Sequence, residues 1–251
     1  MRECFLKGFG KCSAGLSREH YISRTVLEAL GPHGGVNIGG LPWLPPNTFH
    51  GVGLQSLVAK ILCDKHNSGL SEHDDVAGAA FRMLNAVDKD PTSLVPLTTV
   101  GGPHFERWFL KIVCGLSAAG AFRDNVVLDE WKALLYGGQW PDGWGLYVPA
   151  LPGAHMLAQE LSIETRVHPT TRTILAVSFR LAGVHFHLLL GKPDDPAAWG
   201  HHRPRGLIFN TPSGERRLEL RWPHRTEQAV VYTKIGVSGE SPPQWAGWNH
   251  P

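Results

Sequence analysis

The sequence has no apolar run approaching the ~18 residues that a membrane-spanning helix requires, so we expect no membrane segment. Its first residues, MRECFLKGFGKC, lack the apolar stretch of a secretion signal, which predicts a cytoplasmic protein. A strong charge of either sign is also missing, because the formal net charge is +2 and the pI is about 8.4. Dedicated nucleic-acid-binding domains often exceed a pI of about 9. The charge balance therefore permits a nucleic-acid partner without indicating one.

Internal repeats and coiled-coil heptads are absent as well. Hydrophobic residues make up 42% of the chain and charged residues 18%, which is typical of a globular protein and excludes a disordered one. The 29 glycines and 19 prolines show no period, so they predict long loops and not a fibre. A chain of 251 residues forms one large domain or two small ones. We place the expected boundary at Asp90-Pro91, between a module at 1–90 and a second part at 91–251.

Cysteine is scarce, with four residues at positions 4, 12, 63 and 114. A reducing compartment favours metal binding over disulfides, although a Cys4–Cys12 disulfide in an exported protein stays open as an alternative. Cys114 lies in an apolar stretch with helical spacing, where a free thiol packs as a small hydrophobe. The other three cysteines need a fourth ligand. His66 supplies it, because Cys63 and His66 form a C-x-x-H pair.

Hydrophobic periodicity predicts helices in the first half of the chain and strands in the second. The clearest helix covers residues 68–87, where Ser71 and Asp74 form a predicted capping box before an apolar stripe. Other expected elements are a short helix after His20, an irregular hairpin or loop at 34–56, a strand at 57–63, helices within 104–136, a turn region at 137–153 and strands within 171–236. We therefore expect an α+β fold with an N-terminal zinc module, a helical middle and a mostly β C-terminal portion.

A second group of polar residues lies beside the predicted zinc ligands. Glu19 and His20 are adjacent, and on an extended strand their side chains point to opposite sides. Asn67 directly follows the last proposed zinc ligand, so a zinc site would fix its backbone. Phosphodiester cleavage with one metal needs a general base, which histidine suits, and hard oxygen ligands such as Glu and Asn. These residues therefore form a candidate hydrolytic site.

The segments KGFGKCSAGLSREHYISRTVLEAL and AKILCDKHNSGLSEHDD resemble the HNH, or ββα-metal, nuclease superfamily. The resemblance is to its zinc-knuckle branch, which includes phage Holliday-junction resolving enzymes and many bacterial HNH proteins. It covers residues 1–85, and the remainder of the chain matches no family by eye. The resemblance implies a two-stranded ribbon packed on the helix that starts near residue 68, with both elements straddling a nucleic-acid backbone.

The same resemblance implies the role of each site residue. His20 would be the general base, Cys4, Cys12, Cys63 and His66 would bind a structural zinc, and Glu19 and Asn67 would bind a catalytic Mg²⁺ or Mn²⁺. Asp75, one turn into the helix, is a further candidate for this second ion, although the helix dipole explains an acidic residue there equally well. The implied activity is metal-dependent endonucleolytic hydrolysis, with DNA preferred over RNA as the partner. The alternative is a non-catalytic zinc knuckle that binds nucleic acid or protein.

Three features differ from the family pattern. Seven residues separate Cys4 from Cys12 instead of the usual two, and His66 stands where the family has a cysteine. The insertion between His20 and Cys63 is long and lacks the usual asparagine before the second strand. Gln55 and Ser56 of this insertion are alternative candidates to orient the His20 ring.

The C-terminal portion contains a basic stretch at residues 201–225. It holds six arginines and two glutamates. Arginine suits phosphate contacts because its guanidinium group donates paired hydrogen bonds, so this stretch is a candidate nucleic-acid-binding surface. The alternative is a solvated strand face. The candidate nucleic-acid-binding residues are Arg203, Arg205, Arg216, Arg217 and Arg221.

Overall fold

The architecture is mixed α+β, as expected from the sequence. The computed structural model describes residues 3–31, 34–89, 97–122, 127–149, 154–155, 160–181, 184–191, 195–211, 214–223 and 230–236. The helices are α1 (Arg24–Leu30), α2 (Asp64–Gly69), α3 (Ser71–Lys89), α4 (Gly102–Ala118) and α5 (Asp129–Leu135), with short 3-10 turns η1 (Leu54–Ser56) and η2 (Ala197–Trp199). The strands are β1 (Leu16–His20), β2 (Gly35–Gly39), β3 (Phe49–Gly53), β4 (Val58–Cys63), β5 (Thr98–Gly101), β6 (Gly145–Pro149), β7 (Ala154–His155), β8 (Glu160–Val167), β9 (Ile174–Leu181), β10 (Val184–Leu189), β11 (His201–Thr211), β12 (Gly214–Arg221) and β13 (Val230–Gly236).

The strands form one small ribbon and one large sheet. Strands β1 and β4 pair antiparallel, with Leu16 opposite Cys63 and His20 opposite Val58. The large sheet has the order β3-β2-β8-β9-β10-β6-β11-β12-β5, and β13 pairs with β11 and β7. Strands β2 and β3 come from the long insertion between β1 and β4, and β2 pairs in parallel with β8. The insertion therefore connects the N-terminal ribbon to the C-terminal sheet.

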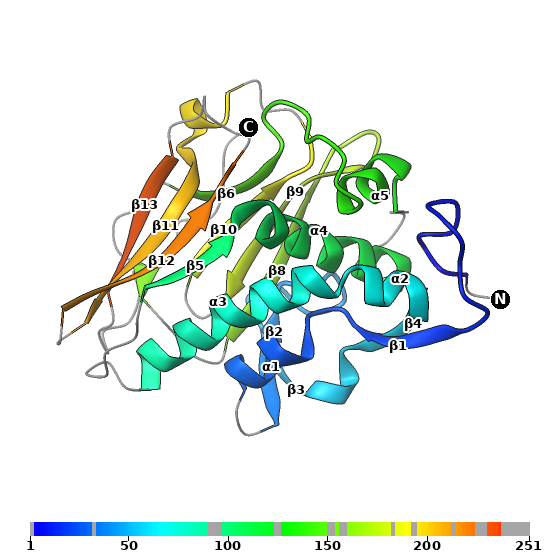
Figure 1. The fold of residues 1–251 in the computed structure, drawn as a ribbon, viewed down its shortest axis with the longest axis horizontal. Helices are drawn as coiled ribbons and strands as arrows, with labels where there is room; N and C mark the ends of the chain where they lie inside the picture. Colours follow the sequence, from blue (N-terminus) through cyan, green and yellow to red (C-terminus); the bar gives the residue numbers. More distant parts are fainter. Residues whose placement is uncertain are drawn as a thin grey trace.

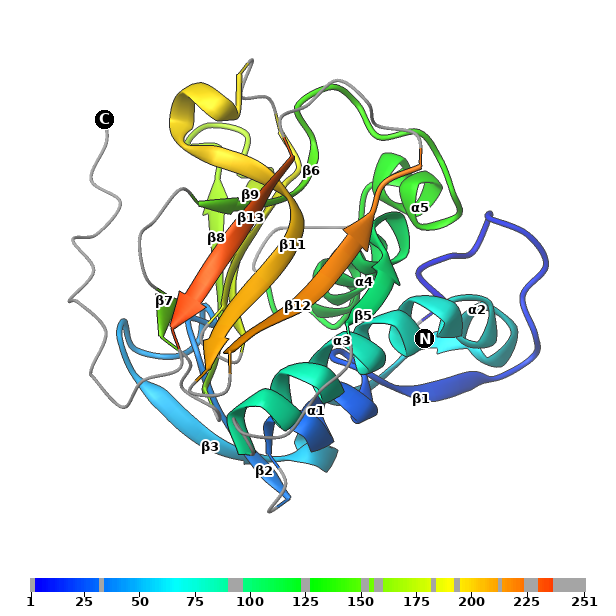
Figure 2. The same ribbon diagram turned by 60° about the vertical axis from the view of Figure 1, so that its left-hand side comes forward.

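Helix α4 lies at the centre of the hydrophobic core. Figure 1 shows this helix between the large sheet and α3, with α1 on the other side of α3, and Figure 2 shows the same layers from the side. Phe105, Trp108 and Phe109 of α4 are fully buried. The Phe109 ring lies 4.8 Å from that of Phe179 on β9, and the Trp108 ring lies 5.5 Å from that of Phe81 on α3. This aromatic layer joins helices to sheet, so residues from both halves of the chain share one core.

Most of the expected elements are present. The irregular hairpin at 34–56 is β2 and β3, the strand at 57–63 is β4, and the clearest helix is α3. The buried Cys114 thiol lies in α4, as expected, and burial raises its pKa. The described residues contain no helix that is both long and apolar enough to cross a bilayer. The expected boundary at Asp90-Pro91 lies outside the described residues.

Two expectations about local structure are wrong. Residues 137–153 are not only a turn region, because β6 lies within them and pairs with β10 in the sheet. The capping box at Ser71 does not form either. The Ser71 hydroxyl donates to the carbonyl oxygen of Ser68, and the Asp74 carboxylate points away from its own helix start toward Ser23 and Lys111. Helix α2 ends at Gly69, directly before α3, so the helix start needs no separate capping box.

Candidate metal centre and adjacent polar network

The four predicted zinc ligands come together in the structure. Their donor atoms, three thiol sulfurs and one imidazole nitrogen, all lie within 4.8 Å of one another. The His66 Nδ1 atom is 3.2 Å from Cys4 Sγ, 3.6 Å from Cys12 Sγ and 3.3 Å from Cys63 Sγ. Around a tetrahedral zinc with bonds of about 2.0–2.3 Å, ligand atoms lie roughly 3.5 Å apart. The cluster can therefore hold a metal such as zinc.

Two local structures supply these ligands. Cys63 ends β4 and His66 lies one turn into α2, and a spacing of three residues places both side chains on the same side of the helix start. Cys4 and Cys12 lie at the two ends of a tight loop, in which Gly8 and Gly10 both have a φ of 100°. Residues with a side chain rarely adopt this conformation. The two glycines therefore allow the loop to return, despite the seven-residue spacing between the cysteines.

A hydrogen bond fixes the tautomer of His66. Its Nε2 atom lies 3.0 Å from the carbonyl oxygen of Phe9, which can only accept, so Nε2 carries the hydrogen. The Nδ1 atom that faces the three sulfurs is then free to bind a metal. Tyr136 packs edge-on against the same imidazole at 5.9 Å between ring centres, and it stacks on Phe9. The ring is therefore held in a ligating orientation from several sides.

The pKa values of the two buried thiols of the cluster are shifted in opposite directions. Burial raises the pKa of Cys4 to about 11. Burial also acts on Cys63, but hydrogen bonds from the His66 backbone and from Ser13 outweigh it and lower the pKa of Cys63 to about 6. The lowered pKa of Cys63 therefore favours the thiolate form, which is the form that binds a metal.

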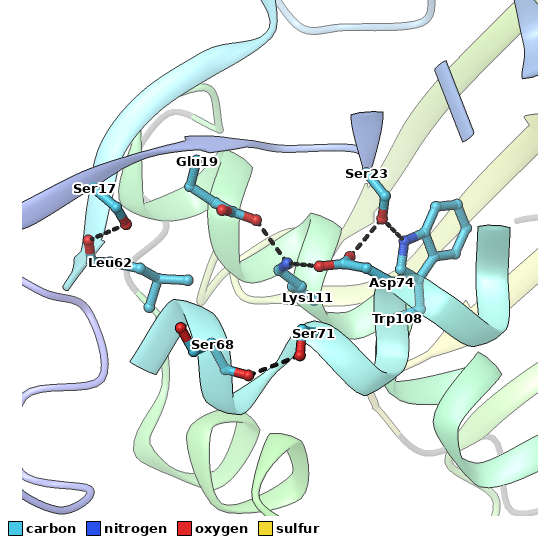
Figure 3. A network of polar contacts seen from close by, with 9 residues as sticks. All are labelled: Ser17, Glu19, Ser23, Leu62, Ser68, Ser71, Asp74, Trp108 and Lys111. Atoms are coloured by element: carbon cyan, nitrogen blue, oxygen red, sulfur yellow. Dashed lines mark hydrogen bonds and ion pairs between the residues drawn. The ribbon is translucent and has the colours of Figure 1, made fainter. Parts of the chain in front are cut away.

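Lys111 lies at the centre of a second polar network beside this cluster, and Glu19 lies at one end of it, as Figure 3 shows. Glu19 is buried, and its Oε1 atom is 2.6 Å from Lys111 Nζ. Burial raises the pKa of this carboxyl, whereas Lys111 and the Asn67 side chain act to lower it. The same ammonium group is 2.6 Å from Asp74 Oδ2. Burial opposes the charge on Lys111, yet the carboxylates of Asp74 and Glu19 raise its pKa. Lys111 is therefore a buried cation between two carboxylates.

The other oxygen of Asp74 continues the network. The Ser23 hydroxyl donates to Asp74 Oδ1 and accepts a hydrogen bond of 2.6 Å from Trp108 Nε1. Ser23 is the residue before α1, but its side chain does not cap that helix. The network thus joins β1, the start of α1, α3 and α4 through hydrogen-bonded side chains.

His20 is placed differently from Glu19. The two side chains leave β1 on opposite sides, as expected for adjacent strand residues, and His20 is half-buried. Within the described part of the chain, its Nε2 atom is buried without a hydrogen-bond partner. Burial, followed by the charges of Arg24 and Arg18, lowers the pKa of this imidazole. The neutral form of the ring is therefore favoured, and its Nε2 atom is closed to solvent in this structure.

Four residues of this network were not expected from the sequence as site residues. They are Ser23, Asp74, Trp108 and Lys111. Asp74 lies near Glu19, where Asp75 was considered, whereas Asp75 is exposed. One signal for Lys111 was available. It is the single lysine in the apolar segment 105–116, and a charged side chain on a buried helix face needs a partner elsewhere.

The expected arginine surface is only partly present. Arg203 is 1% exposed and forms an ion pair of 2.7 Å with the buried Glu106, so its assignment to nucleic-acid binding is wrong. Arg205, Arg217 and Arg221 are exposed on β11 and β12. The Arg216 side chain and all of Arg225 lie outside the described residues.

Comparison of this chain with protein-family models, curated proteins and solved structures finds no match. The disulfide alternative is not seen, because all four cysteines are free thiols. Function must therefore be inferred from the geometry of the two neighbouring sites.

Proposed function

We propose that this protein is a metal-dependent endonuclease of the HNH, or ββα-metal, type that hydrolyses phosphodiester bonds in nucleic acid, with DNA preferred over RNA. The observation that carries the proposal is the position of Asn67. It directly follows the cluster ligand His66, and its side chain is one of the groups that favour the charged form of Glu19 on the neighbouring strand. In this proposal the Cys₃His cluster binds a structural zinc that holds the ribbon of β1 and β4 on helices α2 and α3. Free thiols at such a site favour a cytoplasmic protein.

Glu19 and Asn67 are the residues proposed to hold a catalytic Mg²⁺ or Mn²⁺. A carboxylate and a carboxamide oxygen are the hard ligands that such ions prefer, so the donor set fits. The ammonium group of Lys111 already contacts Glu19, and it must give up this contact when a divalent ion binds there. Asp74 offers Lys111 a second carboxylate and can keep it within the network. When bound, the ion stabilises negative charge on the phosphate and leaving oxygens.

His20 is proposed as the general base. In this proposal the imidazole accepts the proton of a water molecule while the water oxygen forms a bond to phosphorus. Because Nε2 is buried in the free protein, this step requires the ring to become exposed when the substrate binds. The bond between phosphorus and the leaving sugar oxygen breaks, and that oxygen is protonated from solvent. A neutral imidazole is required for this step, which agrees with the lowered pKa of His20.

The test is plasmid nicking by the purified protein in Mg²⁺ or Mn²⁺, with His20→Ala compared with His50→Ala, an exposed histidine on β3. We expect His20→Ala to lower the rate roughly 10²–10⁴-fold, the usual contribution of a general base, and to retain zinc. His50→Ala should nick like the parent protein. Equal nicking by His20→Ala would show that the general-base assignment is wrong.

The burial of the Glu19–Lys111 pair favours a second candidate, a zinc module that binds nucleic acid or protein without cutting it. Glu19 is 8% exposed and Lys111 is 3% exposed, and their mutual ion pair satisfies both charges without any added ion. In that case the network would have a structural role. A parent protein that binds nucleic acid but never nicks it, in any divalent ion, would support this candidate over the nuclease.

A further inference from the structure

A cavity of about 790 Å³ lies where helix α4 begins, on the side of strands β5 and β12. Its volume lies within the ~300–1,000 Å³ that is typical of small-molecule and cofactor sites. It contains no residue of the Cys₃His cluster and no residue of the network around Glu19. The lining residues are Gly101, Pro103, His104, Arg107, Arg205, Glu219, Leu220, Arg221, Trp222 and Pro223.

The lining of this cavity is strongly basic. It has three guanidinium groups and one imidazole against the single carboxylate of Glu219. Among the described residues, no carboxylate forms an ion pair with Arg107, Arg205 or Arg221. Positive charges that converge on a concave surface attract an anion, and guanidinium groups match the geometry of phosphate oxygens.

One of the three arginines is fixed by the backbone. Arg107 Nε donates to the carbonyl oxygen of Leu134 at 2.7 Å. Its two terminal nitrogens donate to the carbonyl oxygens of Pro103 and Gly138. These partners are uncharged, so they orient the guanidinium group without neutralising it. Arg205 and Arg221 are exposed and can move to meet a ligand. The cavity thus has one guanidinium group that is held by hydrogen bonds and two that are exposed to solvent.

An aromatic ring forms part of the cavity wall. Trp222 packs directly on the first residue of α4, where a Cβ atom on Gly102 would lie 2.5 Å from the ring. Its Nε1 atom donates to the carbonyl oxygen of Pro204 at 2.7 Å. The guanidinium carbon of Arg203 also lies over this ring, 5.1 Å from its centre. The indole is therefore held in place as part of the cavity wall.

A series of contacts connects this cavity to the metal centre. His104 Nδ1 lies 3.2 Å from His73 Nδ1, near the start of α3. His73 Nε2 lies 3.3 Å from the carbonyl oxygen of Leu135, and the next residue, Tyr136, packs on the cluster ligand His66. The start of α3 and the end of α5 therefore lie between the cavity and the metal centre.

We propose that this cavity binds a phosphate group of a nucleic-acid strand through Arg205 and Arg221, with Arg107 as a fixed charge and Trp222 as part of the cavity wall. The inference rests on the proposed function for the identity of the ligand, and it places a strand-binding site in the C-terminal part of the chain. Phosphate is a more suitable ligand than a carboxylate of a protein partner because a single lining glutamate leaves the excess positive charge for a polyanion.

The test measures binding of a short fluorescein-labelled DNA strand by fluorescence anisotropy, without added divalent ion so that no cleavage occurs. The variant Arg205→Gln/Arg221→Gln is compared with Arg82→Gln/Arg172→Gln, which removes the same charge from two exposed arginines outside the cavity. We expect the cavity variant to raise the Kd roughly tenfold or more at every sequence tested. The slope of log Kd against log salt should fall by about 0.7–1.4, which corresponds to one or two phosphates. The control variant should change both quantities much less.

Three outcomes would overturn the proposal. They are equal affinity of the cavity variant and the parent protein, an equal loss in both double variants, and binding of a mononucleotide or inorganic phosphate at the cavity without binding of the strand. Unchanged thermal unfolding of the variants would confirm that they fold, since all four substituted side chains are exposed. Because binding is measured without cleavage, arginine-dependent binding by a protein that never nicks DNA would support this site while contradicting the proposed nuclease.

Discussion

The ammonium nitrogen of Lys111 lies 2.6 Å from Glu19 Oε1, in the position where a nuclease of the proposed type requires a divalent cation. Lys111 comes from α4, outside the segment that resembles the HNH superfamily. The protein therefore supplies its own counter-charge to the candidate catalytic carboxylate, and the pair links the metal module to the central helix of the core.

Replacing Lys111 by methionine should destabilise the protein by about 3–5 kcal/mol, because Glu19 and Asp74 would keep buried charges without a cation. Millimolar Mn²⁺ should restore part of this loss, since an added ion can take the place of the ammonium group. Urea unfolding with and without Mn²⁺ measures both effects. The matched control is Lys7→Met, which removes an exposed ion pair with Glu3 and should leave the unfolding midpoint unchanged. Wild-type stability of Lys111→Met would contradict the role given to this lysine.

The metal centre makes a separate prediction about stoichiometry. Elemental analysis should find one zinc per chain in the parent protein, and Cys63→Ser should lose it and unfold at a lower temperature. Cys114→Ser is the control, because it changes an equally buried thiol that is not part of the cluster. It should retain zinc even if it lowers stability. Zinc bound equally by both variants would show that the Cys₃His cluster is not the metal site.

The site residues that the sequence predicted and those that it missed differ in how far apart along the chain the contacting residues lie. Cys63, His66 and Asn67 lie within five residues of one another, so their arrangement follows from a single strand-to-helix junction. The pair of Glu19 and Lys111 joins positions 92 residues apart, and no periodicity reveals such a contact. Local patterns therefore predicted the cluster but not the network beside it.

Helix phase and strand register explain two further errors. The sequence does not show which of the two adjacent acidic residues at the start of α3 faces the core. Asp74 faces inward because it pairs with Lys111 of α4, whereas Asp75 is exposed. Arg203 and Arg205 would face the same side of a regular strand, yet only Arg203 is buried. A register shift between Pro204 and Gly206 interrupts the pairing of β11 with β13 and breaks the alternation there.

The buried pair of Arg203 and Glu106 can be tested against its exposed neighbour. Arg203→Met should lower the free energy of unfolding by about 3–5 kcal/mol, because Glu106 would remain buried without its counter-charge. Arg205→Met, two positions along the same strand, should change it by less than about 0.5 kcal/mol. Urea unfolding of the two variants gives the comparison. Similar values for both would contradict the burial of Arg203.

Two histidines in the large sheet should make stability depend on pH. Burial, followed by the charges of His201 and His185, lowers the pKa of His187 to about 3, and burial together with Arg180 lowers that of His185 to about 4. The unfolded chain binds protons at these positions near pH 6.5, whereas the folded protein does so only near pH 4 at His185 and near pH 3 at His187. Stability is therefore fully present above pH 6.5 and decreases as the pH falls from there toward 3.

Each of these histidines contributes a slope of up to about 1.4 kcal/mol per pH unit within that window. Protonation of the metal ligands also lowers stability in acid, so the parent protein alone does not separate the two causes. His187→Gln removes one titrating group and should flatten the pH dependence of the unfolding free energy between pH 6.5 and 3. His50→Gln, which changes an exposed histidine, should leave the slope as it is in the parent protein. If His187→Gln keeps the full slope as well, the acid sensitivity must come from elsewhere, and the metal centre would be the first place to look.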